Sequence, residues 1–195
     1  MKKLDSIIKQ YLEKRPKFYA YLRPQEAILF YERIRNMKGP ILDFGCGDGF
    51  FASTIFKQRH IDVGLDISSS RIDEIPSVNV YKTIKVYDGT TIPFEMEKFG
   101  TIISNCVFEH IPHIKKCIQE MHRVTKKDGL LMTTVMCSSW SDNLVGGKIL
   151  GKTYNRWFNG IQKHDSLFSK KEYAGEQSDL NLHRHSMFDC DYSGK

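Results

Sequence analysis

A short apolar run that stops at three closely spaced glycines constrains the fold of this chain more than any other feature. Residues 40–44 are apolar apart from Asp43, residues 45–49 read Gly-Cys-Gly-Asp-Gly, and residues 50–57 have helical spacing. Such an apolar run is typical of a buried strand, and the glycines punctuate it before the helical pattern begins. The sequence therefore predicts a strand, a tight turn and a helix between residues 40 and 57.

Strand and helix patterns then alternate through the middle of the chain. Strands are expected at 61–67, 78–87, 101–107 and 130–136, and a helix at 114–124 with Gly129 as its C-terminal stop. Strands that alternate with helices are typical of parallel sheets. We therefore predict an α/β fold, with a mostly parallel sheet and helices on both faces, in a core domain at residues 39–136.

The N-terminal segment, residues 1–38, is predicted to be helical and is strongly basic. Apolar spacing predicts one helix at 2–14, and a second is expected from Pro24 to about Met37. Residues 1–40 hold ten Lys and Arg against four Asp and Glu, which equals the net charge of +6 of the whole chain. Such a segment suits phosphate, an acidic substrate or a membrane surface, and a solvated helix face explains it as well. It carries no nucleic-acid-binding signature, so no nucleic-acid partner is expected.

The pattern becomes looser after the last core strand. Residues 138–165 mix glycines with Trp140, Tyr154, Trp157 and Phe158, which indicates a mobile surface that covers a site. A further helix is expected at 169–182 with Ser169 as its cap, and residues 182–192 can supply one more strand. Residues 137–195 are therefore expected to combine a substrate-side insertion with a C-terminal helix and strand.

Composition argues against several classes of protein. The five cysteines are widely spaced without a CxxC pair, and the histidines lack ligand spacing, so neither a disulfide framework nor a metal site is expected. No apolar run approaches the roughly 18 residues that cross a bilayer, so no transmembrane segment is expected. Asp5, Lys9 and Glu13 interrupt the apolar region that a signal peptide would need. We therefore expect a cytoplasmic protein.

The glycine turn and an acidic residue form the expected ligand site. Parallel sheets bind ligands beyond the carboxyl ends of their strands, and glycine there admits a ligand close to the backbone. Asp66 closes the second strand nineteen residues beyond Gly47, where its carboxylate can accept hydrogen bonds from both hydroxyls of a ribose. Phe50 stands where a dinucleotide site has its third glycine, and Asp43 suits an ammonium group better than phosphates. A dinucleotide-dependent oxidoreductase is therefore disfavoured.

The ordered motifs of residues 40–136 resemble those of S-adenosylmethionine-dependent methyltransferases of the seven-stranded, Rossmann-like family, in particular the methyltransferase type 11 group. The stretches that carry the resemblance are 41–49, 63–68, 87–94, 99–105, 107–111 and 123–131. The resemblance implies S-adenosyl-L-methionine as the cofactor. It also implies helices before the first strand that form a lid over the cofactor cleft, here residues 1–38.

The resemblance further implies a role for each motif residue. The turn would pass under the methionine part of the cofactor, with Asp43 near its ammonium group. Asp66 would bind the ribose, Ile67 would pack on the adenine, and Asn105 and Cys106 would line the cleft near the reactive methyl. The cofactor-binding residues implied in this way are Asp43, Gly45, Cys46, Gly47, Gly49, Asp66, Ile67, Asp88, Gly89, Thr90, Asn105 and Cys106.

Glu109 and His110, directly after the fourth strand, are the nearest candidates for deprotonating an acceptor. A structural cap is an equal alternative for His110, Asp88 with Gly89 can be a plain turn, and the cysteines can be packing residues. The expected acceptor is a small molecule, a lipid or a saccharide. The alternative function is a non-catalytic protein that uses the methyltransferase fold for binding or as a scaffold.

The length of the chain after the fifth strand limits the sheet. The family sheet ends with a sixth and a seventh strand, but only 59 residues follow Met136. We therefore predict a sheet that lacks the usual seventh strand, or one that fills its place with residues 182–192 or with a neighbouring chain. In the last case the protein would be a homodimer, since apolar sheet edges are generally covered.

Overall fold

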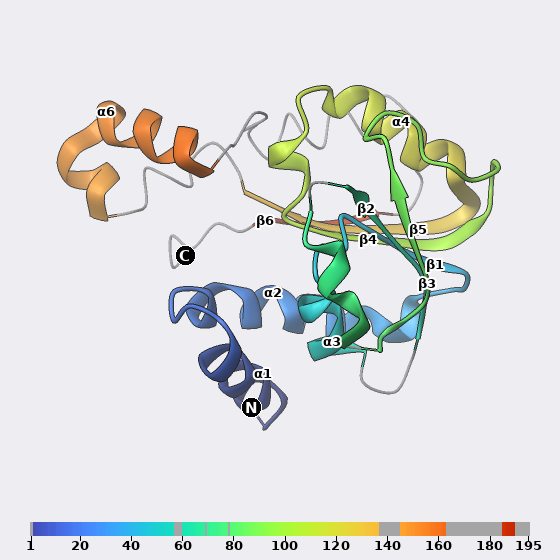
Figure 1. Cartoon of the computed structure of the whole chain (residues 1–195), viewed down its shortest axis with the longest axis horizontal. Helices are drawn as coiled ribbons and strands as arrows, with labels where there is room; N and C mark the ends of the chain where they lie inside the picture. The colour runs from blue at the N-terminus through green and yellow to red at the C-terminus, as the bar shows by residue number, and fades with distance from the viewer. Residues whose placement is uncertain are drawn as a thin grey trace.

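A six-stranded parallel sheet forms the centre of the molecule (Figure 1). The computed structural model describes residues 2–56, 60–68, 70–77, 79–136, 145–162 and 185–189. The strand order is β3-β2-β1-β4-β5-β6. The strands are β1 (Ile41–Phe44), β2 (Ile61–Ile67), β3 (Tyr81–Tyr87), β4 (Phe99–Asn105), β5 (Thr125–Val135) and β6 (His185–Asp189). The predicted α/β fold is confirmed.

Helices cover both faces of this sheet (Figure 1). On one face lie α1 (Lys2–Lys14), α2 (Tyr19–Arg33) and α3 (Phe50–Ile55), and on the other lies α4 (Ile114–Val124). The first face buries a cluster that includes Ile7, Phe30 and Phe50, and the second a cluster that includes Phe99 and Ile118. Short 3-10 helices connect these elements: η1 (Ile34–Asn36), η2 (Ile72–Ser77) and η3 (Phe108–His110). The predicted helical cover of both faces is also confirmed.

The strand order places a ligand site beside β1. The chain builds β2 and β3 on one side of β1, then returns to build β4, β5 and β6 on the other. At such a reversal the connections leave the sheet toward opposite faces, which opens a crevice beyond the carboxyl ends of the neighbouring strands. The crevice expected here lies at the ends of β1 and β4.

The second helix begins earlier than predicted. The expectation of a start at Pro24 was wrong, because α2 begins at Tyr19 and carries Pro24 in its interior. A turn in which the N–H groups of Tyr19 and Ala20 donate to the carbonyls of Pro16 and Lys17 leads into the helix. Proline inside a helix removes one backbone hydrogen bond. Burial of Leu22, Ala27 and Phe30 along this helix offsets that loss.

The prediction that Gly129 ends the helix at 114–124 was wrong, because this glycine lies inside β5. The Thr125 hydroxyl donates to the Met121 carbonyl at 2.6 Å, and β5 begins at this threonine. Along β4 the partner residue changes from Thr125 to Leu130 between Phe99 and Thr101. The residues around Gly129 therefore form an irregularity in the strand, for which glycine is suited.

The glycine- and aromatic-rich segment is also more regular than expected. Within residues 138–165, Val145–Gln162 form the helix α6, which is broken at Gly151, where φ is 60°. The helix expected at 169–182 lies outside the described residues. The strand expected within 182–192 is confirmed as β6, which pairs in parallel with β5. No helix of the described residues is long and apolar enough to cross a membrane.

Candidate functional site

A cavity of about 370 Å³ opens beyond the carboxyl ends of β1, β2, β3 and β4. Its volume falls within the roughly 300–1,000 Å³ typical of small-molecule sites. Most of its wall is apolar, and a few polar side chains converge on it, which is the usual composition of such a site. The lining residues are Phe44, Gly45, Asp66, Ile67, Tyr87, Gly89, Asn105, Cys106, Val107, His110, Ile111 and Pro112.

The cavity brings together part of the predicted site. The predicted residues in its wall are Gly45, Asp66, Ile67, Gly89, Asn105, Cys106 and His110. A neighbouring cavity of about 100 Å³ shares Phe44 and Tyr87 and includes Thr90. The predicted residues that line neither of these two cavities are Asp43, Cys46, Gly47, Gly49, Asp88 and Glu109.

The first glycine of the turn packs closely against Val107, just after the end of β4. Gly45 has a φ of 74°, and a Cβ atom there would lie 2.3 Å from Val107 Cγ2. Its N–H donates to the Leu65 carbonyl at 2.8 Å. The turn is therefore held between β2 and the segment after β4, and no larger residue fits at this position without displacing Val107.

Asp66 joins the end of β2 to the same turn. Its Oδ2 accepts the Gly47 N–H at 2.6 Å, and its Oδ1 accepts the Ile67 N–H at 2.8 Å. Burial raises the pKa of Asp66, and the two backbone donors, together with the Ser70 side chain, oppose that rise because they favour the carboxylate. An ionised carboxylate has about four acceptor positions, so the two bonds leave capacity for the two hydroxyls of a ribose.

Asp43 is engaged beneath the turn rather than in the cavity wall. Its side chain is buried, and its Oδ2 accepts a hydrogen bond from the Tyr81 hydroxyl of β3 at 2.5 Å. Burial raises the pKa of Asp43 to about 7, and the nearby Asp66 carboxylate adds to the rise, whereas the Tyr81 hydrogen bond opposes it. The carboxyl group therefore lies between the turn and β3.

The second helix reaches the carboxyl end of β4. Asn105 Nδ2 donates to Glu26 Oε2 at 2.8 Å and also to the Thr134 hydroxyl of β5. The Cys106 thiol donates to Glu26 Oε1 at 3.7 Å, and Arg23 pairs with the same carboxylate at 2.7 Å. Glu26 is only 2% exposed. Two predicted cleft residues are therefore held from α2 by a carboxylate that no sequence motif reveals.

Cys106 also has an unusual backbone conformation. Its φ of 51° lies in the left-handed region, which residues other than glycine adopt infrequently. Its N–H donates to the Thr134 carbonyl at 2.9 Å. The strand β5 thus holds the first residue after β4 in an uncommon conformation of the kind that clusters at functional sites.

Glu109 is fully buried behind the cavity wall. Neither of its carboxylate oxygens accepts a hydrogen bond from the described part of the chain. Burial raises the pKa of Glu109 to about 7, although its own backbone N–H, Arg23 and the Cys106 thiol lie near enough to oppose part of that rise. His110, the next residue, lines the cavity itself. The two predicted catalytic residues are therefore on different sides of the wall.

The segment after β3 forms a turn at the edge of the site. Asp88 Oδ1 accepts the N–H groups of Thr90 and Thr91 at 2.8 and 3.2 Å, and these bonds lower the pKa of its carboxyl. Gly89, with a φ of 81°, presents its backbone to the cavity. The observed contacts of Asp88 are thus those of a turn residue, and it is the adjoining glycine that lines the cavity.

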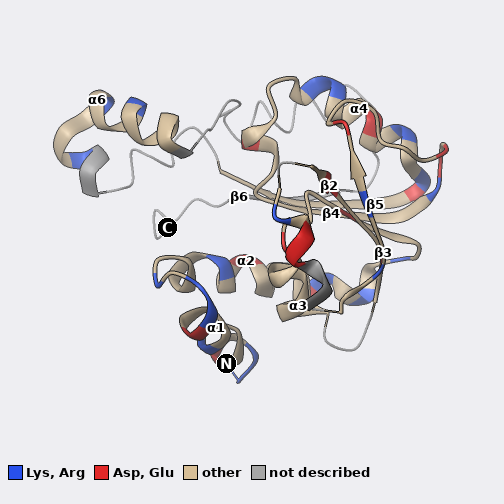
Figure 2. Cartoon of the chain, in the orientation of Figure 1, with Lys and Arg blue, Asp and Glu red and all other residues tan. Residues whose placement is uncertain are grey.

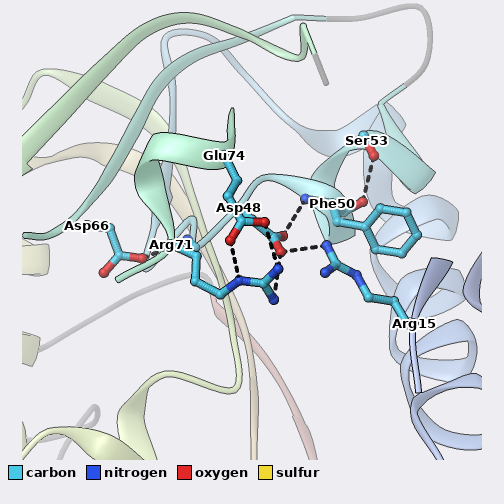
Figure 3. A network of polar contacts seen from close by, with 8 residues as sticks. Arg15, Asp48, Phe50, Ser53, Asp66, Arg71 and Glu74 are labelled. Carbon is cyan, nitrogen blue, oxygen red and sulfur yellow. Dashed lines mark hydrogen bonds and ion pairs between the residues drawn. The ribbon is translucent and has the colours of Figure 1, made fainter. Parts of the chain in front are cut away.

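Charged residues attach α1 and η2 to the glycine turn (Figure 3). Asp48 Oδ1 accepts the Phe50 N–H at 3.0 Å, while Oδ2 pairs with Arg15 at 2.5 Å and with Arg71 at 3.2 Å. Arg15 also lies over the Phe50 ring, 4.3 Å from its centroid, and Arg71 binds Glu74 through two hydrogen bonds. Sequence spacing does not reveal these contacts, because the partners come from separate elements.

Cys46, the cysteine of the glycine turn, packs against β2. Cys46 is buried, and its sulfur lies beside Gly64 of β2, where a Cβ would be 3.2 Å away. Burial raises the pKa of the Cys46 thiol, with the Asp43 and Asp66 carboxylates adding to the rise. Among the described residues no group of three or more His, Cys, Asp or Glu side chains could hold a metal ion.

Comparisons with known proteins agree with this geometry. Residues 42–133 match the family model described as a methyltransferase domain. The chain is 34% identical over 101 residues to an uncharacterised protein of Methanocaldococcus jannaschii, an alignment that covers 51% of this chain and 45% of that protein. It is 28% identical to a ubiquinone biosynthesis O-methyltransferase of Bartonella tribocorum, over 70% of this chain and 56% of that enzyme.

A solved structure extends the likeness over almost the whole chain. The match is to a chain of a Haloferax volcanii complex between the Trm112 methyltransferase activator and a methyltransferase, with a TM-score of 0.65 and 16% identity. It covers 92% of this chain and 74% of that one. At this identity the likeness concerns the fold. The chain spans about half the length of these two curated relatives.

Proposed function

We propose, from the match of residues 42–133 to the methyltransferase domain model, that this chain binds S-adenosylmethionine and transfers the methyl group to an acceptor. The acceptor would be a small molecule, a lipid or a saccharide. The observation that carries the proposal is the cavity beyond β1 and β4, in which Gly45, Asp66 and Asn105 meet an apolar wall.

The residues of the cavity fit the proposed cofactor. Asp66 retains free acceptor capacity toward the cavity after its two backbone bonds, which suits a ribose. Ile67 and Gly89 form one part of the wall, where a Cβ at Gly89 would lie 3.4 Å from Ile67 Cγ2, and this apolar surface suits an adenine ring. Gly45 provides close backbone approach for the methionine part.

When bound, S-adenosylmethionine supplies a methyl group on a sulfonium, and the protein supplies binding, orientation and a dry site. The apolar residues Val107, Ile111 and Pro112 would exclude water from the space beside Asn105 and Cys106. Holding the acceptor in contact with the methyl group is the main task of such a site, because orientation alone contributes a large part of the rate.

A hydroxyl or amine acceptor also has to lose a proton. We assign this role to His110, because its side chain lines the cavity beside Val107 and Ile111. Glu109 is assigned a supporting role, since its carboxyl is buried behind the wall and its raised pKa of about 7 allows it to carry a proton near neutral pH. Glu26 is assigned a positioning role, because its carboxylate accepts hydrogen bonds from Asn105 and Cys106.

We further propose that residues 1–38 close the cofactor cleft. The basis is that Arg15, the residue directly after α1, pairs with Asp48 of the glycine turn, and that α2 contacts the end of β4 through Glu26. Both contacts reach segments that border the cavity. A helical cover held at two points on the site is what the proposed lid requires.

The experiment that tests the function is methyl transfer from S-adenosylmethionine with an isotopically labelled methyl group. The purified chain is incubated with fractionated small molecules, lipids and saccharides, and labelled products are identified by mass spectrometry. The expected result is a labelled product that is absent with His110→Ala and retained with the His122→Ala control, which alters an exposed histidine on α4. Cofactor binding without labelled product from any class would favour the non-catalytic alternative.

A further inference from the structure

The helix α6 stands apart from the sheet and its covering helices (Figure 1). Gly151, with a φ of 60° and a ψ of −144°, divides it into two helical segments. Large apolar side chains are exposed on both segments: Ile149 is 74%, Leu150 66%, Trp157 59% and Ile161 57% exposed. Such a concentration of exposed apolar residues on one element marks an interaction surface.

The apolar residues of the second segment lie on one face. Tyr154, Trp157, Phe158 and Ile161 are separated by three or four positions, which places them together on a helix. The Tyr154 ring lies 5.7 Å from Trp157 and stacks on Phe158 at 5.8 Å, measured between ring centroids. These four residues form a continuous surface, here called the α6 aromatic face.

The opposite side of the helix is basic. Lys152 and Arg156 are four positions apart on the second segment, Lys148 lies on the segment before Gly151, and all three are exposed. Lys152 and Arg156 lie across the helix from the α6 aromatic face, because successive residues are rotated by about 100°. The sequence between Val145 and Gln162 contains no Asp or Glu, and Figure 2 shows blue but no red on this helix.

A bilayer surface with anionic lipid matches both features. A helix with a Lys/Arg-rich polar face and Trp or Phe on the other lies in the plane of the membrane interface. Tyr and Trp rings favour this boundary, and basic side chains are attracted by anionic headgroups. An interaction with a protein groove explains the apolar face, but it gives no reason for a positive charge without any acidic residue along eighteen residues.

We propose that α6 binds the surface of a membrane that contains anionic phospholipid, with the α6 aromatic face inserted at the interface. The helix would lie on the membrane, in agreement with the absence of a spanning helix among the described residues. The basic N-terminal segment, with ten Lys and Arg against four acidic residues in residues 1–40, strengthens the same attraction. This inference rests on α6 and does not require the proposed methyl transfer.

Sedimentation with lipid vesicles tests the proposal on the full chain. One vesicle preparation contains phosphatidylglycerol and phosphatidylcholine in equal amounts, and the other contains phosphatidylcholine alone. The chain is expected to bind the first and to bind the second far more weakly. With Trp140→Phe, the other tryptophan of the chain is removed, and the fluorescence of Trp157 is expected to shift to shorter wavelength on binding.

Charge reversal on α6 provides the decisive variant. Each basic residue near an anionic surface contributes roughly fivefold to binding, so Lys152→Glu with Arg156→Glu should weaken it by at least about 25-fold. The control is Lys126→Glu with Lys127→Glu, which changes the net charge equally at two exposed residues of β5. Circular dichroism checks that both double variants remain folded.

Three results would overturn the proposal. The first is that the chain binds both kinds of vesicle equally well, or binds neither kind. The second is an equal loss of binding in the α6 variant and in the β5 control. The third is self-association of the chain through α6, seen by light scattering without lipid and abolished by Trp157→Glu, since the aromatic face would then bind a second copy.

Discussion

At the scale of single residues, three carboxyl groups near the cavity differ in the hydrogen bonds that they accept. Asp66 receives two backbone N–H groups, Asp43 receives the Tyr81 hydroxyl, and Glu109 receives no hydrogen bond from the described residues. Burial raises the pKa of all three, to about 7 for Asp43 and Glu109. Of the three, Asp66, which accepts two backbone hydrogen bonds, is the one that lies in the cavity wall.

The buried Glu109 makes stability depend on pH. Its pKa is raised from 4.5 to about 7 by burial, so the folded state binds a proton that the unfolded state has released between these values. The free energy of unfolding therefore falls as pH rises through this window. Glu109→Gln should remove this dependence and be more stable than the natural chain at pH 8, by up to about 3 kcal/mol, with little difference at pH 4.

Chemical denaturation at a series of pH values measures this effect. The matched control is Glu32→Gln, because Glu32 is an exposed residue of α2. Its stability profile should follow that of the natural chain. A Glu109→Gln profile parallel to the natural one would show that the carboxyl does not titrate as the structure indicates.

Sequence motifs bring together residues whose position the backbone alone sets. Gly45 and Asp66 are found in the cavity wall because a strand, a turn and a second strand in parallel bring them together. Glu26 reaches Asn105 across 79 positions of the chain, through the packing of α2 on the sheet. No local pattern encodes such a contact, so sequence motifs do not reveal it.

At the scale of elements, the glycine turn and the segment after β4 form one unit. Gly45→Ala places a methyl group 2.3 Å from Val107, whereas a Cβ at Gly47 meets no atom within 4 Å. Both glycines have positive φ, so both substitutions incur a backbone cost of roughly 1–2 kcal/mol. Gly45→Ala should lose about 1–3 kcal/mol more through overpacking.

Thermal or chemical denaturation of both variants tests this difference. Val107→Ala in the Gly45→Ala background should recover part of the lost stability, because it removes the two methyl groups that clash. Equal destabilisation by the two glycine substitutions, or no recovery with Val107→Ala, would contradict the close contact between the turn and the end of β4.

A second contact between elements joins the end of α1 to the same glycine turn, through Arg15 and Asp48. Ile7 and Tyr11 of α1 are buried in the core, so a test of the attachment has to leave the helix in place. Arg15 and Asp48 are mostly buried and pair at 2.5 Å, with exposed fractions of 19% and 16%. A double-mutant cycle with Arg15→Ala and Asp48→Ala should give a coupling of about 1 kcal/mol.

The pair Lys9–Glu13 is the matched control for this cycle. Its atoms are 3.9 Å apart, and its side chains are 78% and 55% exposed. It should couple by only roughly 0.3–0.5 kcal/mol. A coupling of Arg15 with Asp48 no larger than this would mean that the ion pair does not fasten α1 to the turn.

The helix boundaries explain where element prediction fails. Pro24 and Gly129 are residues that commonly start and stop helices, yet here one lies within α2 and the other within β5. In both places tertiary packing overrides the local preference, through the buried Phe30 on α2 and through the pairing of β5 with β4. Such packing becomes known only with the whole fold.

At the scale of the whole molecule, the alternation of strands and helices was sufficient to predict the class of fold. The periodic patterns predicted the positions of β1, β2 and α4 closely, because these segments are apolar on the faces that the fold buries. The strand predicted within residues 182–192 is β6 at 185–189, which lies directly beside β5. The sheet order itself reflects pairing between distant strands, which local patterns do not specify.

The cavity is likewise a property of the whole molecule. Its wall combines the ends of β1, β2, β3 and β4 with η3 and the segment that follows, and it lies at the reversal of strand order. The central claim is that this cavity binds S-adenosylmethionine with Asp66 on the ribose. The demethylated product S-adenosylhomocysteine would bind at the same place and is chemically stable enough for equilibrium work.

Calorimetric titration of S-adenosylhomocysteine into the natural chain and into Asp66→Ala tests this claim most directly. Asp128→Ala, at an exposed carboxylate of β5, is the control, and denaturation confirms that each variant is folded. The account predicts binding to the natural chain and to the control, and roughly 10- to 150-fold weaker binding to Asp66→Ala, from the loss of charge-assisted hydrogen bonds. No binding to the natural chain, or unchanged affinity in Asp66→Ala, would contradict it.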